Sequence, residues 1–190
     1  MRPAVFLDRD GVIIENRDDY VKTWAEARLL PGALEALARL SRSSYALVLF
    51  TNQSAIGRGI ISLAEAQAIN RRLIAEIQGH GGRIDGDYLC PHHPDDACTC
   101  RKPAPGMLLR AATELHLDLA HSYAIGDAVT DLQAARAAGV RGILVRTGRG
   151  RTQAGLLTAL GLADCPVLAD LGAAVDHILG LTPQLRRDSA

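Results

Sequence analysis

The chain has 190 residues, 48% of them hydrophobic and 4% aromatic, and this length suits one domain over residues 1–190 with its own core. Its 21 basic and 21 acidic residues balance, which argues against partners such as nucleic acid or an anionic membrane surface. The sequence shows neither a signal-peptide pattern nor the run of about 18 apolar residues that a transmembrane helix needs, so we expect a cytoplasmic protein.

Six short apolar segments, each bounded by turn residues, are typical of buried strands in a parallel sheet. They are residues 4–8, 46–52, 87–90, 122–127, 142–148 and 166–170. Segments with helical spacing of apolar residues follow them, at 31–42, 62–82, 104–117, 130–140, 151–161 and 170–180. The second helix opens with Ser62 and Glu65, the pattern of a capping box. This alternation predicts an α/β fold with a doubly wound, Rossmann-like parallel sheet.

Acidic residues follow two of the predicted strands. Asp8 ends the first and Asp10 follows it, and Asp127 ends the fourth, with Asp131 one helical turn later. The carboxyl ends of parallel strands form the usual ligand-binding edge, so these residues should meet there. On an extended chain, Asp8 and Asp10 point to one side and Arg9 to the other. Converging carboxylates repel one another unless a cation lies between them, and oxygen ligands favour Mg2+.

The same edge offers the parts of a phosphoryl-transfer site. An aspartate nucleophile can take the phosphoryl group, and a second carboxylate can protonate the leaving alcohol and then deprotonate the attacking water. Thr51 ends the second strand, and Lys102 lies just before a predicted helix. Together with Mg2+, these two side chains would balance the charge on the phosphoryl oxygens.

Four motifs resemble, in the same order, those of the haloacid dehalogenase-like phosphatases: "DRDG", "TN", "RKP" and "GDxxxD". The resemblance implies that Asp8 is the nucleophile and that Asp10 is the acid/base, with its backbone carbonyl on Mg2+. It further implies that Thr51 holds the phosphate, Lys102 neutralises it and Asp127 anchors Mg2+.

Longer motifs are similar to those of one branch of this family, which contains the heptose-bisphosphate phosphatases and the histidinol-phosphatases. "TNQSAIGRG", "PGML" and "VRTG" resemble the heptose group. Ala128 stands where the heptose group carries lysine, and the short spacing from Cys90 to Cys98 resembles the histidinol group. The resemblance implies removal of the 7-phosphate of D-glycero-D-manno-heptose 1,7-bisphosphate, with histidinol phosphate as the alternative substrate.

The rest of the substrate is expected to contact residues near the second strand and the lysine motif. These are Asn52, Gln53, Ser54, Arg58 and Arg101. Arg17 is a further candidate to replace the lysine absent at position 128. The intervals 11–45 and 53–101 leave little room for a large cap domain, so we expect an open site shaped by loops, in a monomer.

Four possible zinc ligands lie within a short stretch of residues 90–100: Cys90, His92, Cys98 and Cys100. Three thiolates and an imidazole form a typical structural zinc site, with no coordination position left for water. Because Lys102 follows closely, a zinc-binding loop would aim that lysine. His93 is the competing ligand, an unmetallated loop is the alternative, and Cys165 is expected in the core.

Other interpretations make different demands of the sequence. A phosphoacceptor signalling domain could share the sheet and the acidic cluster, but it needs neither Lys102 nor a proton donor at Asp10. A calcium loop of the EF-hand type needs glycine at its sixth position, whereas "DRDG" has glycine at the fourth. A zinc-dependent nucleic-acid binder conflicts with the balanced charge and the scarcity of aromatic residues.

Overall fold

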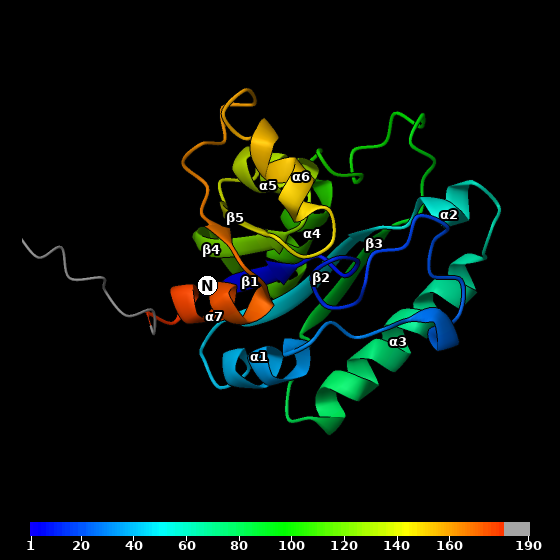
Figure 1. The fold of residues 1–190 in the computed structure, drawn as a ribbon, viewed down its shortest axis with the longest axis horizontal. Helices are drawn as coiled ribbons and strands as arrows, with labels where there is room; N and C mark the ends of the chain where they lie inside the picture. The colour runs from blue at the N-terminus through cyan, green and yellow to red at the C-terminus, as the bar shows by residue number, and fades with distance from the viewer. Residues whose placement is uncertain (181–190) are drawn as a thin grey trace, which may run out of the picture.

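The computed structural model describes residues 1–180; residues 181–190, which the predicted domain includes, lie outside the described residues. Within the described range, six strands form one parallel sheet. They are β1 (Arg2–Leu7), β2 (Ala46–Asn52), β3 (Gly86–Cys90), β4 (Leu117–Gly126), β5 (Arg141–Val145) and β6 (Val167–Leu168). The predicted α/β fold with a doubly wound parallel sheet is confirmed (Figure 1).

Helices connect the strands. The α-helices are α1 (Ala33–Leu40), α2 (Ser54–Gly57), α3 (Leu63–Gly79), α4 (Gly106–Leu115), α5 (Val129–Ala137), α6 (Gly150–Gln153) and α7 (Leu171–Ile178). Two short 3-10 helices are η1 (Trp24–Glu26) and η2 (Ala154–Leu156). The predicted capping box is present at the start of α3, where Ser62 Oγ accepts from Glu65 N and Glu65 Oε2 accepts from Ser62 N.

The strand order positions the site. The sheet runs β3-β2-β1-β4-β5-β6, so β1 lies between β2 and β4 and the direction of winding reverses there. Loops that leave neighbouring strands at such a reversal diverge to opposite faces and open a crevice at the carboxyl edge of the sheet. The segments after β1 and β4, which carry the predicted acidic residues, both border this crevice.

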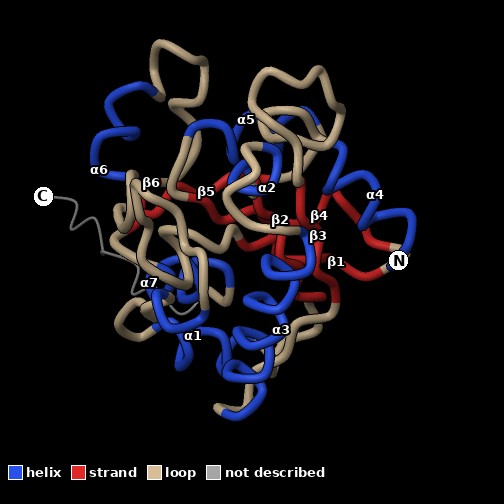
Figure 2. The backbone as a smooth tube through the Cα atoms, turned by 90° about the vertical axis from the view of Figure 1, so that its right-hand side faces the viewer, coloured by secondary structure: helices blue, strands red, loops and turns tan. Residues whose placement is uncertain are grey.

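The sheet is the middle of three layers, as Figures 1 and 2 show. Helices α1, α3 and α7 cover one face, and α4 and α5 cover the other. Successive residues of β1 serve alternate faces: Val5 and Leu7 join the cluster beneath α1, α3 and α7, while Phe6 joins the other. Phe6 also packs edge-to-face on Phe50 of β2, with ring centroids 6.1 Å apart. Because both faces are covered, the strands read as continuous apolar runs.

Four predicted elements differ clearly from the structure. Strand β4 begins at Leu117, five residues earlier than predicted, because Leu117 pairs with Arg2 of β1. Helix α4 correspondingly ends at Leu115, and His116 takes a left-handed conformation with φ 53°. The predicted helix 151–161 is split into α6 and η2, and only two residues of the predicted strand 166–170 pair, as β6.

The predicted absence of a large cap domain agrees with the loops over the crevice. Between β1 and α1 the described chain forms only η1 and two isolated bridges, one from Asp10 to Ile14 and one from Ile14 to Leu29. The zinc-loop segment lies between β3 and α4. Within residues 1–180, no helix combines the length and the apolar character needed to cross a membrane.

Removing a large side chain from the core beneath α3 should destabilise the fold. Leu73 of α3 is fully buried, so Leu73→Ala is expected to lower the free energy of unfolding by about 2–5 kcal/mol. Leu63→Ala is the matched control in the same helix, because Leu63 is 44% exposed and should change it by no more than about 0.5 kcal/mol. Equal effects of the two substitutions in urea denaturation would contradict this packing.

Candidate active site

Three carboxylates gather where the strand order reverses. Asp8 follows β1, Asp127 follows β4, and Asp131 lies in the first turn of α5. One oxygen of each lies within 4.8 Å of the others, and all three residues are buried. The sequence indicates Asp131 near this edge without giving it a role; the structure makes it part of the cluster.

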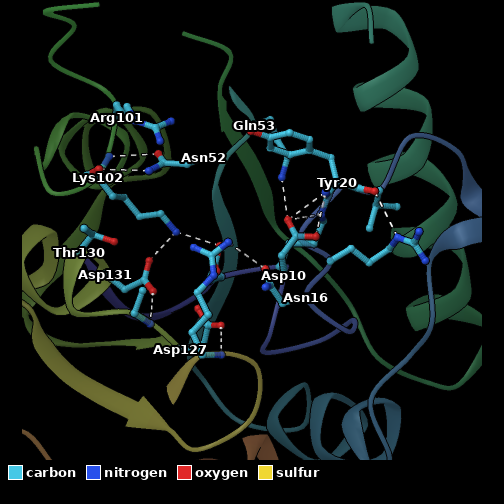
Figure 3. Close-up of a pocket in the computed structure, with 16 residues that line it drawn as sticks. Asp10, Asn16, Tyr20, Asn52, Gln53, Arg101, Lys102, Asp127, Thr130 and Asp131 are labelled. Carbon is cyan, nitrogen blue, oxygen red and sulfur yellow. Dashed lines mark hydrogen bonds and ion pairs between the residues drawn. The ribbon is translucent and has the colours of Figure 1, made fainter. Parts of the chain in front are cut away.

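The ammonium group of Lys102 lies against this cluster, although its backbone belongs to the loop between β3 and α4. Its Nζ lies 2.8 Å from Asp8 Oδ1 and 2.5 Å from Asp131 Oδ1. Figure 3 shows Lys102 reaching toward Asp131. Nζ also donates to the Phe50 carbonyl at 3.0 Å, and Lys102 is only 4% exposed. A buried lysine held this way is fixed beside the predicted nucleophile.

Burial and crowding make the cluster costly to ionise. Burial raises the pKa of Asp8 to about 7, with Lys102 opposing the rise and Asp131 and Asp127 adding to it. Burial also raises the pKa of Asp127 to about 6. For Lys102, burial alone would lower the pKa, but Asp131 and Asp8 hold it above its usual range. One ammonium group therefore does not balance three buried carboxylates.

The cluster fits a magnesium ion. Its donors are carboxylate oxygens from three side chains, close enough to share one ion, and Mg2+ prefers such ligands. An added positive charge would offset the burial and the mutual repulsion that together raise the pKa values of Asp8 and Asp127. Of the predicted ligands, Asp8 and Asp127 belong to the cluster and the carboxylate of Asp10 does not. The contact through the Asp10 backbone carbonyl stays a prediction.

Two glycines allow the Asp127 carboxylate to sit close to the backbone of the neighbouring loops. Gly11 and Gly148 have φ values of 86° and 54°, and a Cβ atom on either residue would overlap Asp127 Oδ2. The same oxygen accepts from Arg149 N at 2.8 Å. The loops after β1 and β5 thus fix the orientation of Asp127.

The carboxylate of Asp10 is held by its own neighbour and by Gln53. Arg9 Nε donates to Asp10 Oδ2 at 3.1 Å, and Gln53 Nε2 donates to the same oxygen at 2.8 Å. The expectation that Arg9 points away from Asp10 is therefore wrong. Strand β1 ends at Leu7, so the alternation of an extended chain no longer applies to the residues that follow.

Most of the predicted catalytic and substrate-binding residues share one pocket. Those that line it are Asp8, Asp10, Asn52, Gln53, Arg101, Lys102 and Asp127. Thr51 and Ser54 are buried and lie outside this lining; Thr51 Oγ1 accepts from Gln53 Nε2 at 2.9 Å. Arg58 follows α2 in an exposed turn and is also outside the lining. The structure does not bring these three side chains to the pocket.

The pocket also contains residues that the motifs do not single out. They are Asn16, Tyr20, Val21, Thr130 and Arg149. Arg149 follows β5 closely, so the rule that ligands bind beyond strand ends could have found it. Its Nη2 donates to Asn16 Oδ1 at 3.2 Å. Arg17 lines the pocket as well, but its guanidinium is paired with Asp19, with both hydrogen bonds at 3.0 Å.

The four predicted zinc ligands converge after β3. The three Sγ–Sγ distances among Cys90, Cys98 and Cys100 are 3.3, 3.7 and 3.8 Å. His92 Nδ1 lies 3.5 Å from Cys90 Sγ and 3.2 Å from Cys100 Sγ. Ligand sulfurs at about 2.3 Å from a tetrahedral zinc ion lie about 3.8 Å from one another, so the four side chains fit one ion.

The competing ligand lies outside this group. His93 is not among the four converging residues. Its backbone N donates to Asp96 Oδ2 at 2.8 Å, and its ring Nδ1 accepts from Asp95 N at 3.3 Å. The geometry therefore favours His92 as the imidazole ligand.

The zinc-loop segment is tied to the end of β2 and to the start of α4. Gln53 N donates to the Cys90 carbonyl at 2.8 Å. Asn52 makes two hydrogen bonds with the Lys102 backbone, each at 3.1 Å, and Gly106 N donates to the Thr99 carbonyl at 3.1 Å. The backbone of Lys102 is thus held from both sides, so the lysine can reach the carboxylates.

The chain is similar in sequence to proteins of known family. A family model described as "HAD-hyrolase-like" matches residues 99–174. The D-glycero-beta-D-manno-heptose-1,7-bisphosphate 7-phosphatase of Bordetella bronchiseptica is 42% identical over 176 residues, which cover 92% of this chain and 97% of that protein. The protein of the same name from Pseudomonas aeruginosa is 44% identical over 149 residues, 78% of this chain and 84% of that one.

Solved structures agree with the sequence comparison. The crystal structure of D,D-heptose 1,7-bisphosphate phosphatase from B. bronchiseptica, complexed with magnesium and phosphate, matches with a TM-score of 0.87 at 41% identity. The match covers 96% of this chain and all of that one. The corresponding enzyme from Burkholderia thailandensis matches with a TM-score of 0.71 at 36% identity, covering 94% and 99% of the two chains.

Elemental analysis of the purified protein should find one zinc ion per chain. Cys98→Ser is expected to lower the zinc content and the melting temperature, because structural zinc contributes roughly 10–16 kcal/mol of apparent binding free energy. Cys165→Ser is the control, since Cys165 lies outside the ligand group. A wild-type protein without zinc, or a Cys98→Ser variant that keeps all of it, would rule out this site.

Proposed function

The chain belongs to the family of the heptose-bisphosphate 7-phosphatases, within the haloacid dehalogenase-like hydrolases, and we propose that it removes the 7-phosphate of D-glycero-β-D-manno-heptose 1,7-bisphosphate. The observation that carries the proposal is the buried contact between Lys102 and Asp8, because it places a cation beside a carboxylate nucleophile. The names of relatives that cover most of the chain support the choice of substrate.

In the first step, Asp8 attacks the phosphorus of the 7-phosphate. Lys102 holds Asp8 Oδ1 at 2.8 Å, and within the described residues the hydrogen bonds of this carboxylate leave Oδ2 free to attack. A new bond forms between Oδ2 and phosphorus as the bond from phosphorus to the sugar oxygen breaks. Lys102 stays beside the oxygens on which negative charge develops.

Asp10 moves the proton in both steps. Asp10 lines the pocket; in its protonated form it would give its proton to the leaving sugar oxygen, so that a neutral alcohol departs and Asp10 is left as a carboxylate. In the second step the Asp10 carboxylate takes a proton from the water that attacks the phosphorus of the aspartyl phosphate. Inorganic phosphate leaves, and Asp8 is regenerated as a carboxylate.

Magnesium would be held by Asp8 and Asp127, with Asp131 and the Asp10 carbonyl as further oxygen donors, and would supply positive charge to the phosphoryl oxygens. The magnesium and phosphate in the B. bronchiseptica structure support this assignment. Thr51 lies outside the pocket lining, so it would act on the phosphate only through Gln53, which contacts both Thr51 and Asp10.

The pocket also offers cations for the phosphate that does not react. Arg101 lines it, and Arg101 Nη1 is buried without a hydrogen-bond partner among residues 1–180. Arg149 lines it too, and neither guanidinium pairs with a carboxylate within the described residues. A bisphosphate can use these cations as well as Lys102, whereas histidinol phosphate carries a single phosphate. This favours the heptose substrate and offers a substitute for the lysine absent at Ala128.

We further infer a cytoplasmic monomer that acts on a small sugar phosphate without nucleic acid or a membrane. The balance of 21 basic and 21 acidic residues supports the absence of polyanionic partners. A zinc site built on three thiolates suits a reducing compartment.

Substitutions of Asp8 and of Asp10 should lower the phosphatase activity to different extents. Asp8→Asn removes the nucleophile, so phosphate release from the heptose bisphosphate should fall to background. Asp10→Asn removes the proton carrier and is expected to lower kcat by roughly 10²–10⁴-fold. Colorimetric phosphate release with added Mg2+ measures both. Full turnover by Asp8→Asn would contradict the mechanism.

The substrate with the highest kcat/KM distinguishes a heptose-bisphosphate phosphatase from a histidinol-phosphatase. We expect the highest kcat/KM with the β anomer of heptose 1,7-bisphosphate, a lower value with the α anomer, and the lowest with histidinol phosphate. Arg101→Ala should reduce kcat/KM for the β anomer of heptose 1,7-bisphosphate more than kcat/KM for histidinol phosphate. Only the bisphosphate has a second phosphate that can lose its contact with Arg101. A higher kcat/KM for histidinol phosphate would favour the alternative function.

A further inference from the structure

We propose that Arg9, held in place by Asn70, is a positioning residue that fixes the carboxylate of Asp10 for proton transfer. The proposal rests on the proposed function, since it concerns the acid/base of that reaction. Arg9 is only 1% exposed and Asn70 is completely buried. Arg9 lies within the "DRDG" motif without a role of its own in it, and Asn70 lies outside all four motifs.

The guanidinium of Arg9 contacts both oxygens of Asp10. Nε donates to Oδ2 at 3.1 Å, and Nη2 donates to Oδ1 at 3.1 Å. Nη2 also lies 2.9 Å from Oδ2, so two nitrogens of one guanidinium contact both oxygens of the carboxylate, which restricts the carboxylate's rotation as well as its position. On the Oδ2 side, Gln53 Nε2 adds a third donor at 2.8 Å; Figure 3 draws the contact between Gln53 and Asp10 as a dashed line.

The remaining end of the guanidinium is held by α3. Arg9 Nη1 donates to Asn70 Oδ1 at 2.9 Å, and Asn70 Nδ2 donates to Asp87 Oδ1 at 2.9 Å. Both ends of the Asn70 amide are therefore used, which fixes its orientation. A buried asparagine within a helix is unfavourable unless it is hydrogen-bonded in this way. The contacts form a chain from β3 through α3 to Asp10.

Position matters for Asp10 because it lies beyond the end of β1, where its backbone forms only an isolated bridge to Ile14 and the sheet does not hold its side chain. A proton carrier has to come within about 2.6–3.2 Å of the atom it serves. A displacement of about 1 Å can cost on the order of 10²-fold in rate. Asn70 and Arg9 supply the restraint that the sheet does not, without contacting the substrate's reacting atoms themselves.

The proposal predicts a dependence on the leaving group. A sugar alkoxide needs a proton when it leaves, whereas p-nitrophenolate leaves readily without one. Arg9→Lys keeps the charge but loses the paired contacts, and Asn70→Leu removes the acceptor for Nη1. Each variant should lower kcat/KM for heptose bisphosphate by at least about 10-fold, while kcat/KM for p-nitrophenyl phosphate changes much less.

Leu73→Ala is the matched control, because it weakens the packing of α3 one turn from Asn70 without touching the hydrogen-bonded chain. It should lower the melting temperature and leave the ratio of the two kcat/KM values unchanged. Variants that lose activity on both substrates in parallel, or on neither, would overturn the proposal. Melting temperature and zinc content show that each variant is folded.

The same experiment separates this proposal from the proposed function. If the wild-type protein hydrolyses p-nitrophenyl phosphate but not heptose bisphosphate, the substrate assignment is wrong. The kcat/KM for histidinol phosphate is then compared with that for p-nitrophenyl phosphate, because the leaving group of histidinol phosphate is also an alcohol. A selective loss on that substrate in Arg9→Lys and Asn70→Leu supports the positioning role, and a parallel loss overturns it.

Discussion

The contact of one buried ammonium group, that of Lys102, with the carboxylates of Asp8 and Asp131 is the interaction on which the site depends. Asp8 follows β1, Lys102 belongs to the loop between β3 and α4, and Asp131 lies at the start of α5, and the three meet because β1 lies between β2 and β4. Each charge would be costly to bury alone, so the sheet order that places them together also makes their burial possible. Folding and assembly of the site are in this sense the same event.

Each reactive group is oriented by a part of the chain that takes no part in the chemistry. The zinc-loop segment and Asn52 hold the backbone of Lys102, Gly11 and Gly148 fit around Asp127, and Arg9 holds Asp10. This arrangement suits a site with no large cap domain, because loops alone have to keep the groups in register. The two ligand groups also suit different metals: the four cysteine and histidine ligands would hold a structural zinc ion, and the three carboxylates would hold the catalytic Mg2+.

The sequence predicted what depends on local pattern and on strand order. Asp8 and Asp127 follow apolar runs, Ser62 and Glu65 form a recognisable cap, and the spacing of the cysteines indicates their convergence. It failed where the outcome depends on contacts between distant segments. Local spacing places Leu117 in a helix, whereas pairing with Arg2 draws it into β4. The contact of Arg9 with Asp10 was missed because the extended geometry ends at Leu7, a boundary that alternation rules do not reveal.

The central claim is that Asp8 itself captures the phosphoryl group, and chemical trapping tests it most directly. The protein is mixed with substrate and Mg2+, quenched in acid during turnover and treated with borohydride, which reduces an aspartyl phosphate to homoserine. The account predicts homoserine at Asp8, located by peptide mass spectrometry, and none in the Asp8→Asn variant. Homoserine at another residue would contradict the account. So would a wild-type protein that hydrolyses the substrate without forming any homoserine.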